Sequence, residues 1–150
     1  MRLADILDIG RVSTSLVASD KTEVLQALAG MFSGQDSEEV FRVFVEREAL
    51  ASTGVGSGVA IPHGRLGAVD RLQAALAVSR EGVEFDAVDG QPAHIFIAVL
   101  APDRHTGDHL KALARISRLL RDGRVRSRLL EATDPSAALS VVLDEEARLG

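Results

Sequence analysis

One histidine lies in an unusually constrained part of the sequence, the segment 52–65. Pro62 directly precedes His63, and glycine occupies positions 54, 56, 58 and 64. Proline fixes one backbone dihedral and favours an extended residue before it, whereas glycine lets a second molecule approach the main chain closely. An imidazole held in this way beside Arg65 suits chemistry on an anionic group, because histidine is a competent nucleophile near neutral pH. A histidine that only hydrogen-bonds its own loop is the simpler alternative.

The glycines do not fit the common nucleotide-binding loops. A P-loop requires a lysine after its last glycine, and the segment contains no lysine. The dinucleotide fingerprint GxGxxG, started at Gly56, requires a glycine where Ile61 stands. Ser57 does not fit the GxSxG pattern of serine hydrolases either. The candidate reactive group is therefore the histidine itself.

A second histidine, His109, starts the clearest helical pattern in the chain. At helical spacing it shares one face with Leu113, Ile116 and Leu120. In the first turn of a helix, free backbone N–H groups favour an anion, so this ring could face a bound anionic group. A half-buried core histidine explains the same pattern, and the residues alone favour neither interpretation.

The other two histidines raise the question of a metal site. We expect His94, at the start of an apolar strand, to pack, and His105, in a polar loop, to be solvated. His105 and His109 form HxxxH, but Gly107 weakens a regular helical pairing and the zinc-protease pattern HExxH is absent. We therefore expect no metal and no cofactor. A metal-dependent hydrolase that uses His63, His105 and His109 stays open as an alternative.

Composition limits the class of protein. The 150 residues, 46% hydrophobic and 26% charged, are enough for one soluble domain with a real core. The net charge of −5 argues against nucleic acid as a partner, and the lack of cysteine excludes disulfides and thiolate chemistry. Asp5 and Asp8 interrupt any signal peptide, and the longest apolar run, 95–101, is far shorter than the ~20 residues of a membrane span. We expect a cytoplasmic protein without membrane insertion.

Hydrophobic periodicity predicts the elements that carry these residues. Capping patterns start helices at Asp20 and Asp36, and Gly34 is expected to end the first of them. Strands are expected at 11–18, 72–78 and 93–100, and further helices near 109–121, near 125–132 and after Asp134-Pro135. The run 93–100 is apolar almost throughout, which is typical of a central strand covered on both faces. The interleaved order predicts an α/β (α+β) fold of one domain, 1–150, with a mixed β-sheet flanked by helices on both faces.

Arg47 and a group of arginines between positions 115 and 128 could each be functional or simply solvated. Arg47, between Glu46 and Glu48 at the end of a helix, could simply be exposed to solvent. A basic stretch consists of arginines at positions 115, 118, 121, 124, 126 and 128. A solvated helix face is the simpler explanation of this stretch, and a docking surface for an acidic protein is the alternative.

Two segments resemble a known family. Residues 47–65 closely resemble the active segment of the phosphotransferase-system enzyme IIA proteins of the fructose–mannitol–nitrogen class, and 108–121 resemble their second signature. The likeness implies that His63 is phosphorylated, that His109 supports the phosphoryl group, and that Arg47 approaches it from the preceding helix. It also implies a phosphoryl-binding loop, formed by Ser52, Thr53, Gly54, Gly56 and Gly64. Ala51 stands where glycine is often expected.

The resemblance also implies partners. A phosphotransferase relay without a nucleotide motif must receive phosphate from another phosphoprotein, here an HPr-like phosphocarrier. The opening residues look like the nitrogen-regulatory class, so we expect a regulatory enzyme IIA that acts on target proteins according to its phosphorylation state. A freestanding sugar-transport enzyme IIA that passes phosphate to a IIB component is the alternative.

Overall fold

Strand β6 (Ala93–Pro102) forms the centre of the fold, because its side chains are buried on both sides. The computed structural model describes residues 1–104 and 107–150. Alternate residues of β6 enter two separate apolar cores: Ile95, Ile97 and Val99 belong to one, and Phe96, Ala98 and Leu100 to the other. The apolar run at 93–100 therefore predicted a central strand correctly.

The sheet around β6 is mixed. β5 (Gln73–Val83) pairs antiparallel with β6, and β1 (Leu7–Ser13) pairs parallel with β5. On the other side of β6, β3 (Val59–Ala60) and then β4 (His63–Leu66) run parallel to it. β2 (Gly54–Gly56) pairs antiparallel with β3 at the far edge. Within the described part of the chain the sheet has six strands.

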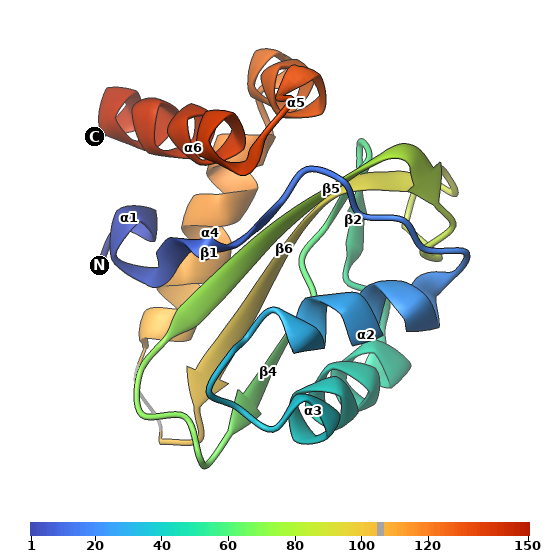
Figure 1. Cartoon of the computed structure of the whole chain (residues 1–150), viewed down its shortest axis with the longest axis vertical. Helices are drawn as coiled ribbons and strands as arrows, with labels where there is room; N and C mark the ends of the chain where they lie inside the picture. Colours follow the sequence, from blue (N-terminus) through green and yellow to red (C-terminus); the bar gives the residue numbers. More distant parts are fainter. Residues whose placement is uncertain (105–106) are drawn as a thin grey trace.

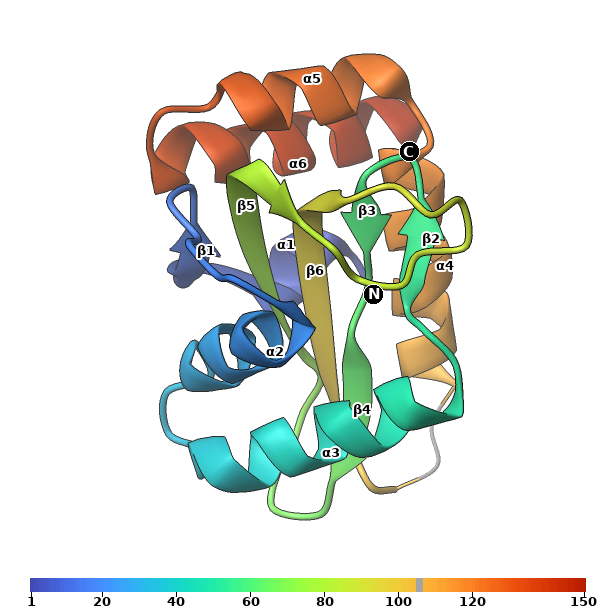
Figure 2. The ribbon, with the colours of Figure 1, turned by 90° about the vertical axis from the view of Figure 1, so that its right-hand side faces the viewer.

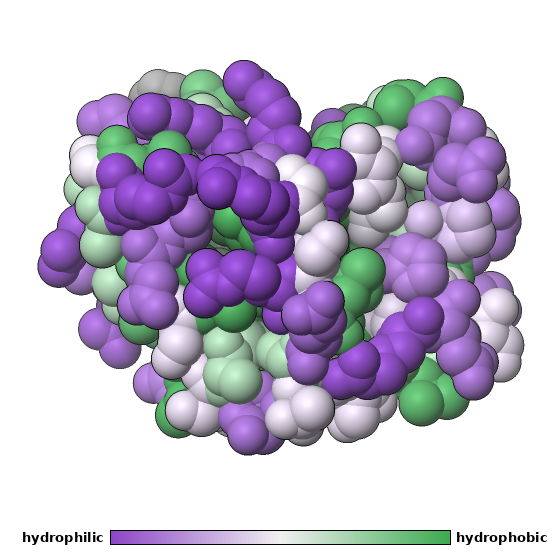
Figure 3. All heavy atoms as spheres, turned by 90° about the horizontal axis from the view of Figure 1, so that it is seen from above, coloured by the Kyte–Doolittle hydropathy of each residue, from purple (hydrophilic) through white to green (hydrophobic). Residues whose placement is uncertain are grey.

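Helices cover both faces of this sheet (Figures 1 and 2). On one face lie α2 (Lys21–Gly30) and α3 (Ser37–Leu50), which supply the second core. On the other lie α1 (Leu3–Ile6), α4 (Asp108–Leu120), α5 (Gly123–Glu131) and α6 (Pro135–Leu149). Seen from the side of α5 and α6, the surface is mostly hydrophilic, with separate apolar patches (Figure 3). The predicted mixed sheet with helices on both faces is confirmed.

Side-chain caps explain where the helices begin. The Asp20 carboxylate accepts a hydrogen bond from the Glu23 N–H at the start of α2, and Asp36 does the same for Glu38 in α3. At α6, Asp134 accepts from the Ala137 N–H and proline occupies the first helical position. Each such cap stabilises a helix by about 1 kcal/mol. These three predicted starts are confirmed.

Three predicted boundaries are wrong. The strand expected at 72–78 continues to Val83 in β5. The first strand lies at 7–13 rather than 11–18, because a register irregularity between Leu7 and Val12 breaks its alternation and leaves Ile9 exposed. Helix α2 ends at Gly30, and Gly34, with a φ of +89°, lies in the turn that follows. The glycine-rich segment also contains three short strands, β2 to β4, where the sequence indicated a loop.

Candidate active site

A cavity of about 400 Å³ lies where the end of α3, strand β4 and the start of α4 meet. These parts of the three elements are at the lower right of Figure 2. It brings together His63, His109 and Arg47, which come from three separate elements. Exposed leucines, Leu50 and Leu110, stand among its lining residues. The other lining residues are Val43, Glu46, Gly64, Arg65, Val99, Ala101 and Leu113. The three side chains named by the family resemblance therefore share one cavity.

Both ring nitrogens of His63 have defined partners. His63 is the first residue of β4 and pairs with Val99 of β6. Its Nδ1 lies 2.8 Å from the Ile61 carbonyl oxygen, which can only accept, so Nδ1 carries the proton. Its Nε2 lies 3.2 Å from Nε of Arg47, which can only donate, so Nε2 presents its lone pair. The hydrogen bonds thus select the neutral tautomer with Nε2 unprotonated.

The electrostatics of the cavity favour the same state. Burial lowers the pKa of His63 below its ordinary value near 6.5, and electrostatic repulsion from Arg47 and, on protonation, from His109 lowers this pKa further. The hydrogen bond to the Ile61 carbonyl and the charge of Glu48 act in the opposite direction and are outweighed. At neutral pH the ring is therefore uncharged, which is the form that acts as a nucleophile.

Arg47 is fixed at the end of its helix. While its Nε faces His63, its Nη1 donates to the carbonyl oxygen of Ala51 at 2.9 Å, just beyond the last turn of α3. The side chain is half-buried. The solvent-exposed arginine that the sequence also allowed is therefore not what the structure shows.

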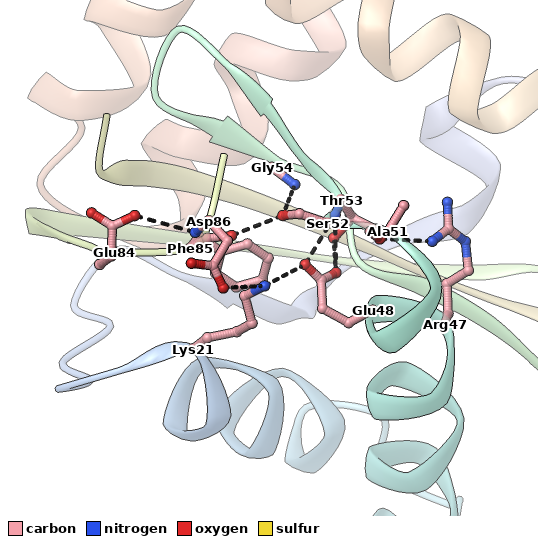
Figure 4. A network of polar contacts seen from close by, with 10 residues as sticks. All are labelled: Lys21, Arg47, Glu48, Ala51, Ser52, Thr53, Gly54, Glu84, Phe85 and Asp86. Atoms are coloured by element: carbon pink, nitrogen blue, oxygen red, sulfur yellow. Dashed lines mark hydrogen bonds and ion pairs between the residues drawn. The ribbon is translucent and has the colours of Figure 1, made fainter. Parts of the chain in front are cut away.

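The buried carboxylate of Glu48 anchors the segment that follows α3, next to Arg47. Figure 4 shows its polar contacts. Glu48 is only 8% exposed and accepts hydrogen bonds from the N–H of Thr53 at 2.9 Å and from its hydroxyl at 2.6 Å. It also forms an ion pair with Lys21 at 2.9 Å, and Lys21 in turn contacts Asp86 at 3.1 Å. Burial raises the pKa of Glu48, but the bonds from Thr53 and Lys21 outweigh it and keep this pKa below its usual range.

This network continues through the main chain to the ring of His63. Thr53, held by Glu48, accepts a hydrogen bond from the Ile61 N–H at 2.9 Å through its carbonyl oxygen. The carbonyl of Ile61 then accepts the proton of His63 Nδ1. The orientation of the imidazole is therefore connected to the end of α3 by a continuous series of hydrogen bonds.

The predicted phosphoryl-binding loop divides into two parts. Gly64 lines the cavity, and a Cβ there would lie 3.0 Å from a methyl group of Val43, so glycine permits the close approach of β4 and α3. Ser52, Thr53 and Gly54 belong to the polar network behind the cavity, and Gly56, with a φ of +96°, forms part of the β2–β3 turn. These four lie outside the cavity lining, so their contact with a phosphoryl group stays a prediction.

Sequence reasoning missed one residue of the cavity as a site residue. Nη2 of Arg65 donates to Nε2 of His109 at 2.8 Å, and both side chains line the cavity. Residues two apart on a strand point to the same side, so β4 places Arg65 beside His63. The sequence placed Arg65 near this histidine but did not predict the strand, and so gave no reason to include Arg65 in the site. In this arrangement Nε2 of His109 is an acceptor, so this nitrogen could donate to a phosphoryl oxygen only after Arg65 moves and Nε2 gains a proton.

His94 lies outside the cavity lining. Nδ1 of His94 donates to the carbonyl oxygen of Ser79 at 3.1 Å, as expected of a packing residue. No group of three or more histidine, cysteine, aspartate or glutamate side chains suited to a metal ion occurs among residues 1–104 and 107–150. His105, the third residue of the hydrolase alternative, lies outside the described residues.

Comparisons with known proteins agree with the geometry. The family model of the phosphoenolpyruvate-dependent sugar phosphotransferase system, EIIA 2, matches residues 5–145. A nitrogen regulatory protein of Bradyrhizobium diazoefficiens is 38% identical over 95% of both chains. A fructose-specific EIIA component of Haloferax volcanii is 38% identical over 73% of this chain and 71% of its own. The crystal structure of a nitrogen regulatory protein IIA-Ntr from Neisseria meningitidis has a TM-score of 0.88, at 29% identity, over 93% of this chain and 98% of its own.

The fold and the family model together define the class: the chain belongs to the EIIA type 2 family of the phosphotransferase system. Its relatives include both nitrogen-regulatory and sugar-specific proteins. Among the described helices, none is long and apolar enough to cross a bilayer.

Proposed function

We propose that residues 1–150 act as one regulatory enzyme IIA domain that accepts a phosphoryl group on Nε2 of His63 from an HPr-like phosphocarrier. The observation that carries this proposal is the hydrogen bond from Nδ1 to the Ile61 carbonyl, which leaves Nε2 unprotonated and directed into the cavity. We propose a cytoplasmic location as well, since the donor would be a soluble phosphoprotein.

The transfer itself exchanges one phosphorus–nitrogen bond for another. The lone pair of Nε2 forms a bond to phosphorus while the phosphorus–nitrogen bond of the donor histidine breaks, and the donor ring recovers its electron pair. Nδ1 of His63 keeps its proton throughout, because the Ile61 carbonyl continues to accept it. In such transfers catalysis comes mostly from positioning and electrostatics.

Three side chains would stabilise the charge on the transferred group. Arg47 already lies against Nε2 and would redirect its donors to the phosphoryl oxygens when Nε2 becomes bonded. Arg65 and His109 line the same cavity from the other side. Removal of one well-placed donor of this kind typically costs ~2.7–4 kcal/mol of transition-state stabilisation.

The regulatory role rests on the nitrogen regulatory relatives, which match nearly the whole chain. In this role the phosphorylation state of His63 would decide whether target proteins bind. The alternative is a freestanding sugar-transport enzyme IIA that donates to a IIB component, and the likeness to a fructose-specific EIIA supports it.

The decisive experiment combines phosphorylation with ³¹P NMR. Incubation with a phosphorylated HPr-like protein should produce one acid-labile phosphohistidine with the spectrum of the Nε2 isomer. His63→Gln should abolish it, whereas His94→Gln, which changes a histidine outside the cavity, should not. A label that persists in the His63→Gln protein, or that sits on Nδ1, would contradict the proposal.

A second measurement separates the two roles. The phosphorylated protein is mixed with a fructose-class IIB domain and the transfer is followed over time. Slow or absent transfer is expected of a regulator, whereas rapid and complete transfer would favour sugar transport.

A further inference from the structure

The charge of this protein is distributed unevenly along the chain. Residues 108–131, which include α4 and α5, contain seven lysines and arginines against three acidic residues, a net charge of +4. The whole chain carries −5, so the remainder carries −9. A basic region in an acidic protein is a feature that the proposed phosphoryl transfer does not use.

The outward side of α4 concentrates this positive charge. Its exposed positions Lys111, Ala114, Arg118 and Arg121 follow at intervals of three, four and three residues, so they form one stripe about 15 Å long. The side chains of Lys111, Arg118 and Arg121 make no hydrogen bond or ion pair with the part of the chain that the structure describes. We call these three the α4 basic stripe.

Two exposed arginines on other helices are neutralised locally, in contrast to the stripe. On α3, Arg42 forms ion pairs with Glu39 and Glu46, both at 2.8 Å. On α5, Arg124 pairs with Asp122 at 2.9 Å. A helix face that only has to be solvated usually mixes charges of both signs in this way. Asp108, in the first turn of α4, is the exposed acidic residue nearest to the stripe in sequence, and no ion pair joins it to Lys111. The charge of the α4 basic stripe is therefore available to an acidic group outside the described chain.

We propose that the α4 basic stripe is a docking surface for an acidic surface of a partner protein. Long polyanions such as nucleic acid, or an anionic membrane, would also meet the net charge of −9 on the rest of the molecule and be repelled by it. An acidic patch of limited size can contact the stripe alone. Its natural counterpart is a row of glutamates or aspartates about 15 Å long, the length of three helical turns.

The stripe faces away from the cavity. At 3.6 residues per turn, Ala114 and Arg118 lie about 140–180° around α4 from His109. His109 and Leu113 line the cavity, whereas none of the three cations does. A partner on the stripe therefore leaves His63 accessible, and docking is independent of phosphoryl acceptance.

The test uses a fluorescent 20-residue polyglutamate peptide, followed by anisotropy at low ionic strength. Wild type is compared with Lys111→Gln/Arg118→Gln/Arg121→Gln and with a control, Arg42→Gln/Arg71→Gln/Arg104→Gln, which loses the same charge elsewhere. We expect the stripe variant to bind about tenfold more weakly, Arg118→Gln alone to bind about twofold more weakly, and the control to match wild type within about twofold. Amide shifts on peptide addition should map to α4, and phosphorylation of His63 should be unchanged in the stripe variant.

Four results would overturn the proposal. Equal losses in the stripe variant and the control would assign binding to bulk charge. Tighter binding to a DNA duplex, or to vesicles rich in phosphatidylserine, would assign the stripe to another class of partner. A wild-type dimer that the stripe variant cannot form would make a second copy of this chain the occupant. Undetectable binding of the peptide by wild type would remove the docking surface altogether.

Discussion

The two sides of the cavity are built differently. On the α3 side, His63 is half-buried, both of its ring nitrogens have partners, and the buried Glu48 supports it from behind. On the α4 side, Nε2 of His109 is held by Arg65, whose side chain is exposed to solvent. The imidazole of His63, the proposed nucleophile, is thus fixed by its partners on the α3 side, whereas the contact between His109 and Arg65 lies at the solvent-exposed side of the cavity and is more easily exchanged.

This difference suits the chemistry we propose. A nucleophile gains rate from a fixed orientation, because less freedom is lost on the way to the transition state. A donor that must follow a negatively charged group into and out of the cavity benefits from a partner it can release. Substitutions on the α3 side should therefore change rate and stability more than substitutions on the α4 side.

The largest effect after loss of His63 itself is expected for Arg47→Gln. The substitution removes the cation against Nε2, so phosphorylation of His63 should slow by about 10²–10³-fold. Because the charge of Arg47 lowers the pKa of His63, that pKa should also rise. Stopped-flow phosphoryl transfer and NMR titration of the ring measure the two effects. If Arg47→Gln slowed the transfer no more than Arg65→Gln does, the α3 side of the cavity would not contribute more to the rate than the α4 side.

Glu48→Gln should come next, and it should act on stability. One amide cannot satisfy the N–H and hydroxyl of Thr53 together with Lys21, so the free energy of unfolding should fall by about 1–3 kcal/mol. Urea unfolding measures this loss. Glu46→Gln, an exposed neighbour paired with Arg42, is the matched control and should cost less than about 1 kcal/mol. Equal costs would mean that burial of Glu48 has no energetic consequence.

Arg65→Gln should have a smaller effect. It removes one exposed cation and the partner of His109 Nε2, and we expect phosphoryl transfer to slow about tenfold with the free energy of unfolding unchanged. The tautomer of His109, read from its ¹⁵N shifts, should change, while that of His63 should not. A change at His63 would show that the two sides of the cavity are not independent.

The smallest effect concerns pH. Burial lowers the pKa of His63, so the unfolded chain takes up this proton at a higher pH than the folded chain. The associated stability is complete above about pH 6.5 and is lost as the pH falls through the lower pKa of the folded state. Urea unfolding of wild type should therefore show a steeper decline over this window than unfolding of His63→Gln. If stability fell equally with pH in the two proteins, the pKa of His63 would not be lower in the folded than in the unfolded state.

The sequence predicted those features that depend on local patterns. The central strand follows from an unbroken apolar run, and the helix starts at Asp20, Asp36 and Asp134 follow from capping chemistry. Strands of two to four residues, such as β3 and β4, are too short for any periodicity to reveal. The first strand was misplaced because its register irregularity hides the alternation.

The site was predicted only in part, for a related reason. The surrounding glycines and proline indicated His63 as the candidate reactive group. Its pairing with His109 and Arg47 came from the family resemblance, since distant elements meet only in the folded chain. Glu48 was read as a charged residue at a helix end, and its burial depends on Lys21, far away in the sequence. Arg65 was adjacent to the site in sequence, yet its partner lies on α4.

Gly64 restricts which residues position 64 can accept. It lies between His63 and Arg65 on β4, and its missing methyl group is what lets the strand reach within contact distance of Val43 on α3. An alanine there would have to move the strand or the helix by a few tenths of an ångström, and the 3.2 Å contact between Arg47 and the imidazole spans the same gap. The spacing between Arg47 and the imidazole therefore depends on the absence of a methyl group at position 64, and we expect Gly64→Ala to slow the proposed phosphoryl transfer more than it destabilises the fold.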